Sequence, residues 1–270
     1  ARNLLLLRDN AGSLGRVDTE RIMENWEKEA GIELAAAQKD AIRGSLRYGV
    51  FALTGGPGTG KTTIIKGILA VLERAGCKVL LAAPTGRAAR RLAEAAGREA
   101  KTVHRLLEYN VTGVFGKDED DPLEANAVIV DEASMLDIVL TYHLLEALPA
   151  GCRLILVGDV DQLPSVGAGS VLKDIIRSGK MPVVRLQEVF RQAEVSPIVR
   201  NAHKINQGEL PECVPDSDFA MALYQNEFEA AEFITETYAQ ANAKDWQQCQ
   251  VLTPMHRGPC GVENLNKLLQ

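Results

Sequence analysis

The chain has 270 residues, 24% of them charged, and a formal net charge of −6 at pH 7. This length allows one large domain or two smaller ones with a sizeable buried core. No run of eighteen apolar residues is present, so neither a membrane-spanning helix nor a membrane partner is expected. The negative net charge argues against a uniformly basic nucleic-acid coat. The five cysteines form no C-x-x-C pair, which predicts reduced thiols in a cytoplasmic protein.

The first part of the chain is expected to be helical. Residues 17–34 predict a capped helix that ends at Gly31, and residues 35–49 predict a second helix that leads into the first strand. We interpret residues 1–30 as a linker or as the tail of an N-terminal accessory region.

Apolar runs of strand length then alternate with amphipathic stretches. Helices are expected over 88–96, 135–148, 169–179, 196–208 and 228–243. Strands are expected over 50–53, 78–83, 127–132, 153–159, 181–186 and 249–254. Such alternation predicts an α/β fold, with a parallel sheet covered by helices on both faces. Residues 108–122 interrupt the pattern and predict a small inserted β-hairpin, with an ordinary surface loop as the alternative.

The segment Gly55–Thr62 matches the pattern G-x-x-x-x-G-K-[ST] between a predicted strand and a predicted helix. Its glycines allow backbone N–H groups to surround an anion, Lys61 can reach the β- and γ-phosphates, and the Thr62 hydroxyl can ligate Mg²⁺. The predicted cofactors are therefore ATP and Mg²⁺. The expected nucleotide-binding residues of this loop are Gly56, Pro57, Gly58, Thr59, Gly60, Lys61, Thr62 and Thr63.

Acidic residues follow two later strands. Asp131 and Glu132 end the strand "AVIV", where Asp131 can hold Mg²⁺ and Glu132 can activate the water that attacks the γ-phosphate. Asp159, Asp161 and Gln162 follow the next strand, and Gln162 is a candidate γ-phosphate sensor. The segment Gly86–Arg105 has six basic residues against two acidic ones, which indicates either a phosphate track or a solvated helix face.

Seven stretches together resemble the RecD-like helicases of superfamily 1, which move 5′ to 3′ on single-stranded DNA and include the alpha subunit of exodeoxyribonuclease V. In order, they are "LTGGPGTGKTT", "LAAPTGRAARRL", "TVHRLL", "VIVDEASMLD", "LILVGDVDQLPSVGAGSVL", "LQEVFRQ" and "VLTPMHRGPCGVENLN". The resemblance runs from about Gly31 to the last residue. It implies a RecA-like lobe over 31–195 with a pin at about 108–122, and the linker helices and incomplete start of a second lobe over 196–270. The chain is thus expected to be a fragment of a helicase.

The resemblance also implies roles for single residues. Gln38 would read the adenine, and Arg191 would stabilise transition-state charge beside the catalytic Lys61, Glu132 and Gln162. The residues expected to contact DNA are Pro84, Thr85, Arg87, Thr102, His104, Ser165 and Val166. Expected partners are single-stranded DNA, duplex junctions and other subunits of a recombination nuclease complex.

Three alternatives stay open. The chain could belong to a stand-alone helicase or to the subunit of a complex. It could be an ATP-binding regulatory or assembly module without motor action, although binding alone needs neither Glu132, Gln162 nor Arg191. It could also be the helicase part of a conjugative relaxase.

Overall fold

The computed structural model describes residues 1–12, 14, 17–186, 196–245 and 249–269. Within these ranges the chain divides into two compact units, residues 1–211 and 212–270. Among the described residues, no helix is long and apolar enough to cross a membrane.

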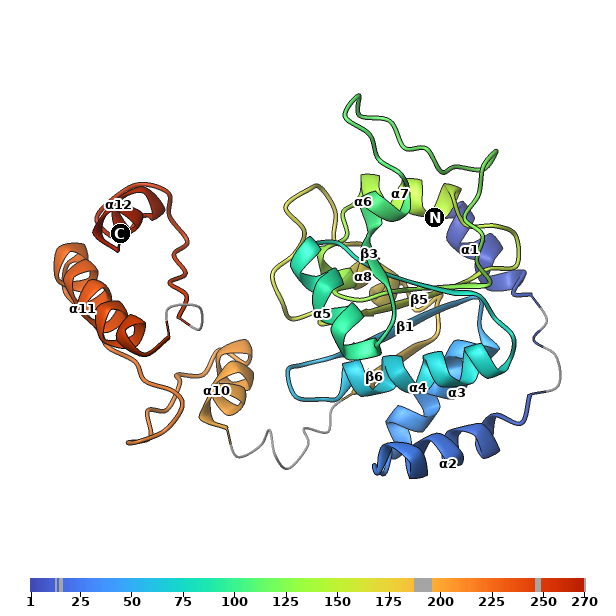
Figure 1. Cartoon of the computed structure of the whole chain (residues 1–270), viewed down its shortest axis with the longest axis horizontal. Helices are drawn as coiled ribbons and strands as arrows, with labels where there is room; N and C mark the ends of the chain where they lie inside the picture. The colour runs from blue at the N-terminus through green and yellow to red at the C-terminus, as the bar shows by residue number, and fades with distance from the viewer. Residues whose placement is uncertain (13, 15–16, 187–195, 246–248, 270) are drawn as a thin grey trace. The chain divides into compact units, whose positions relative to one another are not determined.

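A six-stranded parallel sheet forms the centre of the first unit (Figure 1). Its order is β3-β2-β4-β5-β1-β6, and every neighbouring pair is parallel. The strands are β1 Val50–Gly55, β2 Val79–Ala83, β3 Ala100–Thr102, β4 Ala127–Val130, β5 Arg153–Gly158 and β6 Val183–Leu186. The predicted α/β class is confirmed. The central strands β4 and β5 are buried along their whole length, because helices exclude water from both faces of the sheet.

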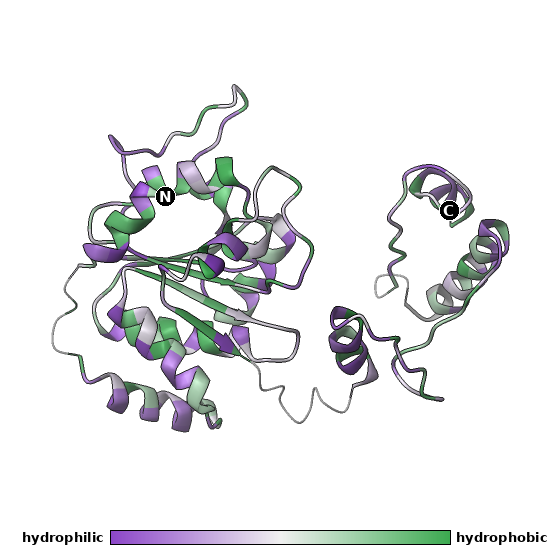
Figure 2. Ribbon diagram, turned by 180° about the vertical axis from the view of Figure 1, so that it is seen from behind, coloured by the Kyte–Doolittle hydropathy of each residue, from purple (hydrophilic) through white to green (hydrophobic). Residues whose placement is uncertain are grey.

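Alternate strand residues pack into two separate apolar clusters. Val50 and Ala52 of β1 face one cluster, whereas Phe51 and Leu53 face the other, as the two-residue period of a strand requires. The first cluster includes α1 (Arg2–Asp9), α7 (Ile138–Glu146) and α8 (Val171–Ser178). The second includes α2 (Thr19–Ala30), α3 (Ala36–Arg47) and α4 (Lys61–Arg74). Figure 2 shows hydrophobic strands between helices that carry hydrophilic residues as well.

The N-terminal helices belong to this packing. The Asp18 side chain caps α2 by accepting a hydrogen bond from the Arg21 N–H at 3.1 Å. The helix ends at Gly31, whose φ of 64° lies in the left-handed region that favours glycine. The predicted end of this helix is therefore confirmed. Helices α2 and α3 both pack against α4.

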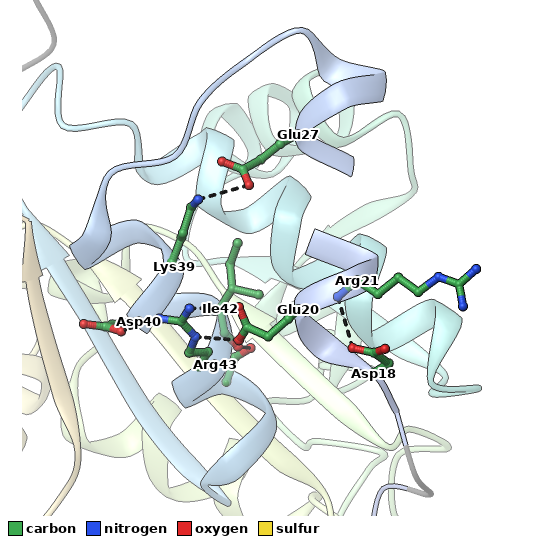
Figure 3. A network of polar contacts seen from close by, with 9 residues as sticks. Asp18, Glu20, Arg21, Glu27, Lys39, Asp40, Ile42 and Arg43 are labelled. Carbon is green, nitrogen blue, oxygen red and sulfur yellow. Dashed lines mark hydrogen bonds and ion pairs between the residues drawn. The ribbon is translucent and has the colours of Figure 1, made fainter. Parts of the chain in front are cut away.

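A buried carboxylate ties α2 to α3 (Figure 3). Glu27 is only 9% exposed. Its Oε1 accepts a hydrogen bond from the Leu34 N–H at 2.6 Å, and its Oε2 lies 3.2 Å from Lys39 Nζ. A second, exposed link joins Arg43 to Glu20 through two hydrogen bonds of 2.7 and 2.9 Å. Because Glu27 is shielded from water, its contacts matter more for stability than the exposed pair.

We expect Glu27→Ala to lower the free energy of unfolding by about 1–3 kcal/mol, because it leaves the Leu34 N–H without its acceptor. Urea denaturation followed by circular dichroism measures this change. Glu29→Ala is the matched control, because Glu29 lies on the same helix and its pair with Arg74 is exposed. If Glu27→Ala and Glu29→Ala lost equal free energy of unfolding, the stabilising role assigned to the buried contacts of Glu27 would be wrong.

Two predicted β-elements do not form. Residues 103–126 contain no strand, so the expected hairpin at 108–122 is wrong and the segment is a loop. Local side-chain bonds explain this result, since they compete with strand pairing. The Asn110 carboxamide oxygen accepts from the N–H groups of Thr112 and Val114, and the Asp118 carboxylate accepts from those of Asp120 and Asp121.

The expected strand at 249–254 is also not formed over its described residues. The described part of the second unit contains no other strand to pair with it. That unit instead contains α11 (Glu227–Asp245) and α12 (Val262–Leu268), and the Ala231 and Leu265 side chains are buried. The helix predicted at 196–208 is α10 (Pro197–Asn206), in the first unit, with Pro197 in its first turn.

Candidate nucleotide and nucleic-acid site

The loop between β1 and α4 forms an anion cradle. Gly58 and Gly60 have φ angles of 76° and 80°, which place both in the left-handed region open to glycine. Lys61 begins α4, and its Nζ donates hydrogen bonds to the carbonyl oxygens of Gly55 at 2.6 Å and Gly56 at 2.9 Å. The ammonium group thus lies over the loop at the start of a helix, where a phosphate can replace the two carbonyls as its partner.

A cavity of about 640 Å³ adjoins this loop. Its walls come from the loop itself, the ends of β5 and β6, and α10. A β-carbon at Gly56 would lie 2.9 Å from Cε1 of His203, so the glycine permits α10 to approach closely. His203 Nε2 is buried and has no hydrogen-bond partner among the described residues. The volume suits a nucleotide-sized ligand.

A second cavity, of about 330 Å³, is lined by residues from four different segments. It is lined by Thr62 from α4, Asp131 and Glu132 after β4, and Gln162 after β5, together with residues of α5 (Gly86–Ala96). Four predicted nucleotide-site residues therefore surround one space. A parallel sheet produces this result because the carboxyl ends of its strands meet at one edge.

The two carboxylates of this cavity are electrostatically perturbed. Burial raises the pKa of Asp131, although the Glu132 N–H bond to Asp131 Oδ1 at 2.9 Å and the charge of Lys61 act in the opposite direction. Burial also raises the pKa of Glu132, and the negative charge of Asp131 adds to this effect. Glu132 Oε2 is buried without a hydrogen-bond partner among the described residues. Glu132 can therefore accept a proton more readily than an exposed glutamate.

Gln38 is 2% exposed near the start of α3. Its Oε1 accepts a hydrogen bond from the Ala35 N–H at 3.0 Å, whereas its Nε2 has no partner in the described part of the chain. Gln38 lines neither of the two cavities. The Nε2 amide of Gln38 is therefore the group that can donate a hydrogen bond to a ligand.

The residues predicted to contact DNA lie on loops, at the end of β3 and in the helices α5 and α6, where Arg87 and His104 are found. Thr85 caps α5 by accepting from the Ala88 N–H at 3.2 Å, and Thr102 caps the short helix α6 (Val103–Leu106) by accepting from the Arg105 N–H at 3.1 Å. Both threonines therefore lie where a strand passes into a helix. Arg87 lines the cavity of Asp131 and Glu132, and Pro84 lies just after β2.

The loop after Gln162 presents Val166 to solvent, with its side chain fully exposed. Ser165 is turned inward, because its Oγ lies 2.9 Å from the Gly167 carbonyl and 2.7 Å from the Gly169 carbonyl. The two residues thus have different surroundings. Arg191, the predicted arginine finger, lies outside the described residues.

Cationic residues that the sequence analysis did not single out also border these sites. Arg91 lines the cavity of Asp131 and Glu132, and its charge favours the ionised form of Glu132. Its position four residues after Arg87 on one helix was a usable signal. Arg90, Lys101 and Arg105 line a third cavity, of about 600 Å³, that includes Thr102.

Comparison with known proteins gives the family. Residues 33–224 match the family model described as AAA domain. The chain belongs to this family. The chain also resembles curated RecD2 and RecD proteins. It is 39% identical over 254 residues to "ATP-dependent RecD2 DNA helicase" of Deinococcus radiodurans, with 90% of this chain covered. It is 38% identical over 226 residues to "RecBCD enzyme subunit RecD" of Mycobacterium tuberculosis, with 74% covered.

Solved structures support the fold of this AAA-domain chain. The crystal structure of Pif1 helicase from Candida albicans matches it with a TM-score of 0.51 and 20% identity, over 81% of this chain and 56% of that chain. The chain spans only 33% of the RecD2 relative and 38% of the RecD relative. The family implies nucleotide binding, which agrees with the cradle around Lys61.

Proposed function

We propose that this chain is the ATP-binding and ATP-hydrolysing lobe of a DNA helicase motor that moves 5′ to 3′ on single-stranded DNA. The observation that carries the proposal is the convergence of Thr62, Asp131, Glu132 and Gln162 on one cavity beside the phosphate loop. Binding alone would not require Glu132, a half-buried glutamate with a raised pKa. The names of the curated relatives, a DNA helicase and a RecBCD subunit, support the motor function.

Mg²⁺ suits the residues present. Thr62 and Asp131 supply a hydroxyl and a carboxylate to the same cavity, which are the oxygen donors that this ion prefers. Burial disfavours the charge of Asp131, and a cation would restore it. When bound, the ion would neutralise charge on the phosphate oxygens.

The remaining roles belong to the chain's own side chains. Lys61 would exchange the Gly55 and Gly56 carbonyls for β- and γ-phosphate oxygens. Glu132 would orient the attacking water and take its proton, and Gln162, which lines the same cavity, would hold the γ-phosphate or that water. Arg191 is proposed to add positive charge at the transition state.

Gln38 is proposed to recognise the adenine through Nε2, the group that has no partner among the described residues. Its Oε1 is already bonded to the Ala35 N–H, which fixes the orientation of the carboxamide. A donor in a fixed position discriminates between bases because an unpaired buried polar group is costly.

Single-stranded DNA is proposed to cross the starts of α5 and α6, which carry Thr85, Arg87, Thr102 and His104. Pro84, Ser165 and Val166 are proposed to contact the same strand. The cations around Thr102 support backbone contact, which gives salt-dependent affinity with little sequence preference. Duplex junctions and other subunits of a recombination nuclease complex remain the proposed partners of the whole motor.

The test has two parts. ATP hydrolysis by this chain is expected to require Mg²⁺ and to rise when oligothymidylate is added. The protein that contains this lobe is expected to unwind a duplex with a 5′ single-stranded tail and to leave a 3′-tailed duplex intact. Arg74→Ala serves as the control, because Arg74 pairs with Glu29 on the surface. Preferential unwinding of the 3′-tailed duplex would refute the proposed 5′-to-3′ polarity. ATP hydrolysis that neither depends on DNA nor drives unwinding would refute the proposed motor function.

A further inference from the structure

Five aromatic rings form a continuous chain between α6, the loop 108–122 and α7. In order they are His104, Tyr109, Phe115, His143 and Tyr142. Their successive centroids are 5.3, 4.7, 4.2 and 5.2 Å apart, within the range of favourable ring contacts. Figure 1 shows the loop projecting from the core beside α6 and α7. The rings therefore fix the base of a segment that otherwise lacks secondary structure.

The members of this chain differ in what they contact. Phe115 is partly buried and packs against the apolar cluster that contains α7. Tyr142, at one end, is 52% exposed, and its hydroxyl is hydrogen-bonded to the Glu146 carboxylate, which raises its pKa. Tyr109 is 47% exposed. Anchoring of the loop explains Phe115 but gives no reason for a large ring at Tyr109 with half of its surface in water.

The position of Tyr109 supplies a reason. Its N–H donates to the His104 carbonyl at 2.9 Å, so it lies one turn beyond Arg105 at the end of α6. Arg105 lines the cationic cavity with Arg90, Lys101 and Thr102. Arg90 pairs with Glu94 and Lys101 with Glu99, whereas Arg105 has no ion pair with any described residue. Glu108 turns the chain toward Tyr109 in the left-handed conformation, with a φ of 56°.

We propose that Tyr109 stacks on a base of single-stranded DNA whose phosphates lie along the cavity of Arg90, Lys101 and Arg105. This inference rests on the proposed function and assigns a base-contacting residue within it. A phosphate needs a cation and a base needs an aromatic face, and Arg105 and Tyr109 supply the two from positions four residues apart at the end of α6. Because every base has such a face, the contact would act on any sequence.

The experiment compares two labelled oligonucleotides of equal length, oligothymidylate and an abasic strand, by fluorescence anisotropy. Tyr109→Ala is expected to weaken binding of oligothymidylate about 5- to 100-fold, the range for loss of one stacked base. It should leave binding of the abasic strand unchanged, and Tyr109→Phe should bind both strands normally. Tyr142→Ala, a tyrosine of similar exposure at the other end of the ring chain, is the matched control.

Arg105→Ala separates this proposal from the underlying function. This variant should weaken the binding of both strands equally and reduce the slope of log affinity against log salt concentration by about 0.7. If Arg105→Ala behaves in this way and Tyr109→Ala leaves oligothymidylate binding unchanged, the stacking proposal alone is overturned. The stacking proposal would also be overturned if Tyr109→Ala lost equal affinity for both strands, since the ring would then act on the fold of the loop. Failure of the unaltered chain to bind either strand would overturn both proposals.

Discussion

Replacing Glu132 by glutamine is expected to reduce the rate of ATP hydrolysis by about 10²- to 10⁴-fold, the usual contribution of a general base. Glutamine keeps the size of the side chain and its place beside Asp131 but cannot take a proton from water. Nucleotide affinity should be almost unchanged, because Lys61 and the phosphate loop remain intact. Single-turnover hydrolysis and a separate binding titration distinguish the two effects.

The same substitution should stabilise the fold at neutral pH. Burial raises the pKa of Glu132, so its charged form is less stable in the folded chain than in the unfolded one. This penalty is present above the folded pKa and disappears below the unfolded pKa, where the carboxyl is protonated in both states. The melting temperature of Glu132→Gln should therefore exceed that of the unaltered chain at pH 7 and match it in acid.

Glu124→Gln is the control for both measurements. Glu124 lies on the surface, and its hydrogen bond to Lys78 lowers its pKa, so removal of its charge has no stabilising effect of this kind. The Glu124→Gln variant should hydrolyse ATP at the rate of the unaltered chain. A Glu132→Gln variant that hydrolyses ATP at the normal rate would refute the role of Glu132 as the base.

Lys61→Ala is expected to raise the Kd for ATP by roughly 10- to 100-fold, because it removes charge-assisted hydrogen bonds worth about 1.5–3 kcal/mol. Within the part of the chain that the structure describes, the Lys61 ammonium bonds to the carbonyls of Gly55 and Gly56, which can bond to water instead. The loss should therefore concern binding far more than folding. Titration with a fluorescent ATP analogue measures the Kd.

Lys66→Ala provides a matched comparison, because Lys66 is exposed on the same helix, α4, and lies outside the phosphate loop. Its Kd should equal that of the unaltered chain. If Lys61→Ala and Lys66→Ala bound ATP equally well, the cradle described around Lys61 would not be the phosphate site.

Elements with local causes were predictable from the amino-acid sequence. The glycines of the phosphate loop were recognisable because their left-handed backbone angles are needed within a few residues of Lys61. The end of α2 at Gly31 followed from the same property. Apolar runs separated by amphipathic helices were sufficient to predict a parallel sheet, because strands covered on both faces have no polar side.

Features that depend on contacts between distant residues required the folded arrangement of the chain. The 108–122 segment is a loop because Asn110 and Asp118 bond to their own neighbours, and the β-prone residues of the segment do not reveal that competition. The convergence of Thr62, Asp131 and Gln162 on one cavity depends on the order of the strands. The tilted contact of Tyr109 with Phe115 and the stacking of Phe115 on His143 likewise join a loop to a helix more than twenty residues away. Such contacts follow from the packing of the whole sheet, since no local pattern in the chain specifies which distant residues will meet.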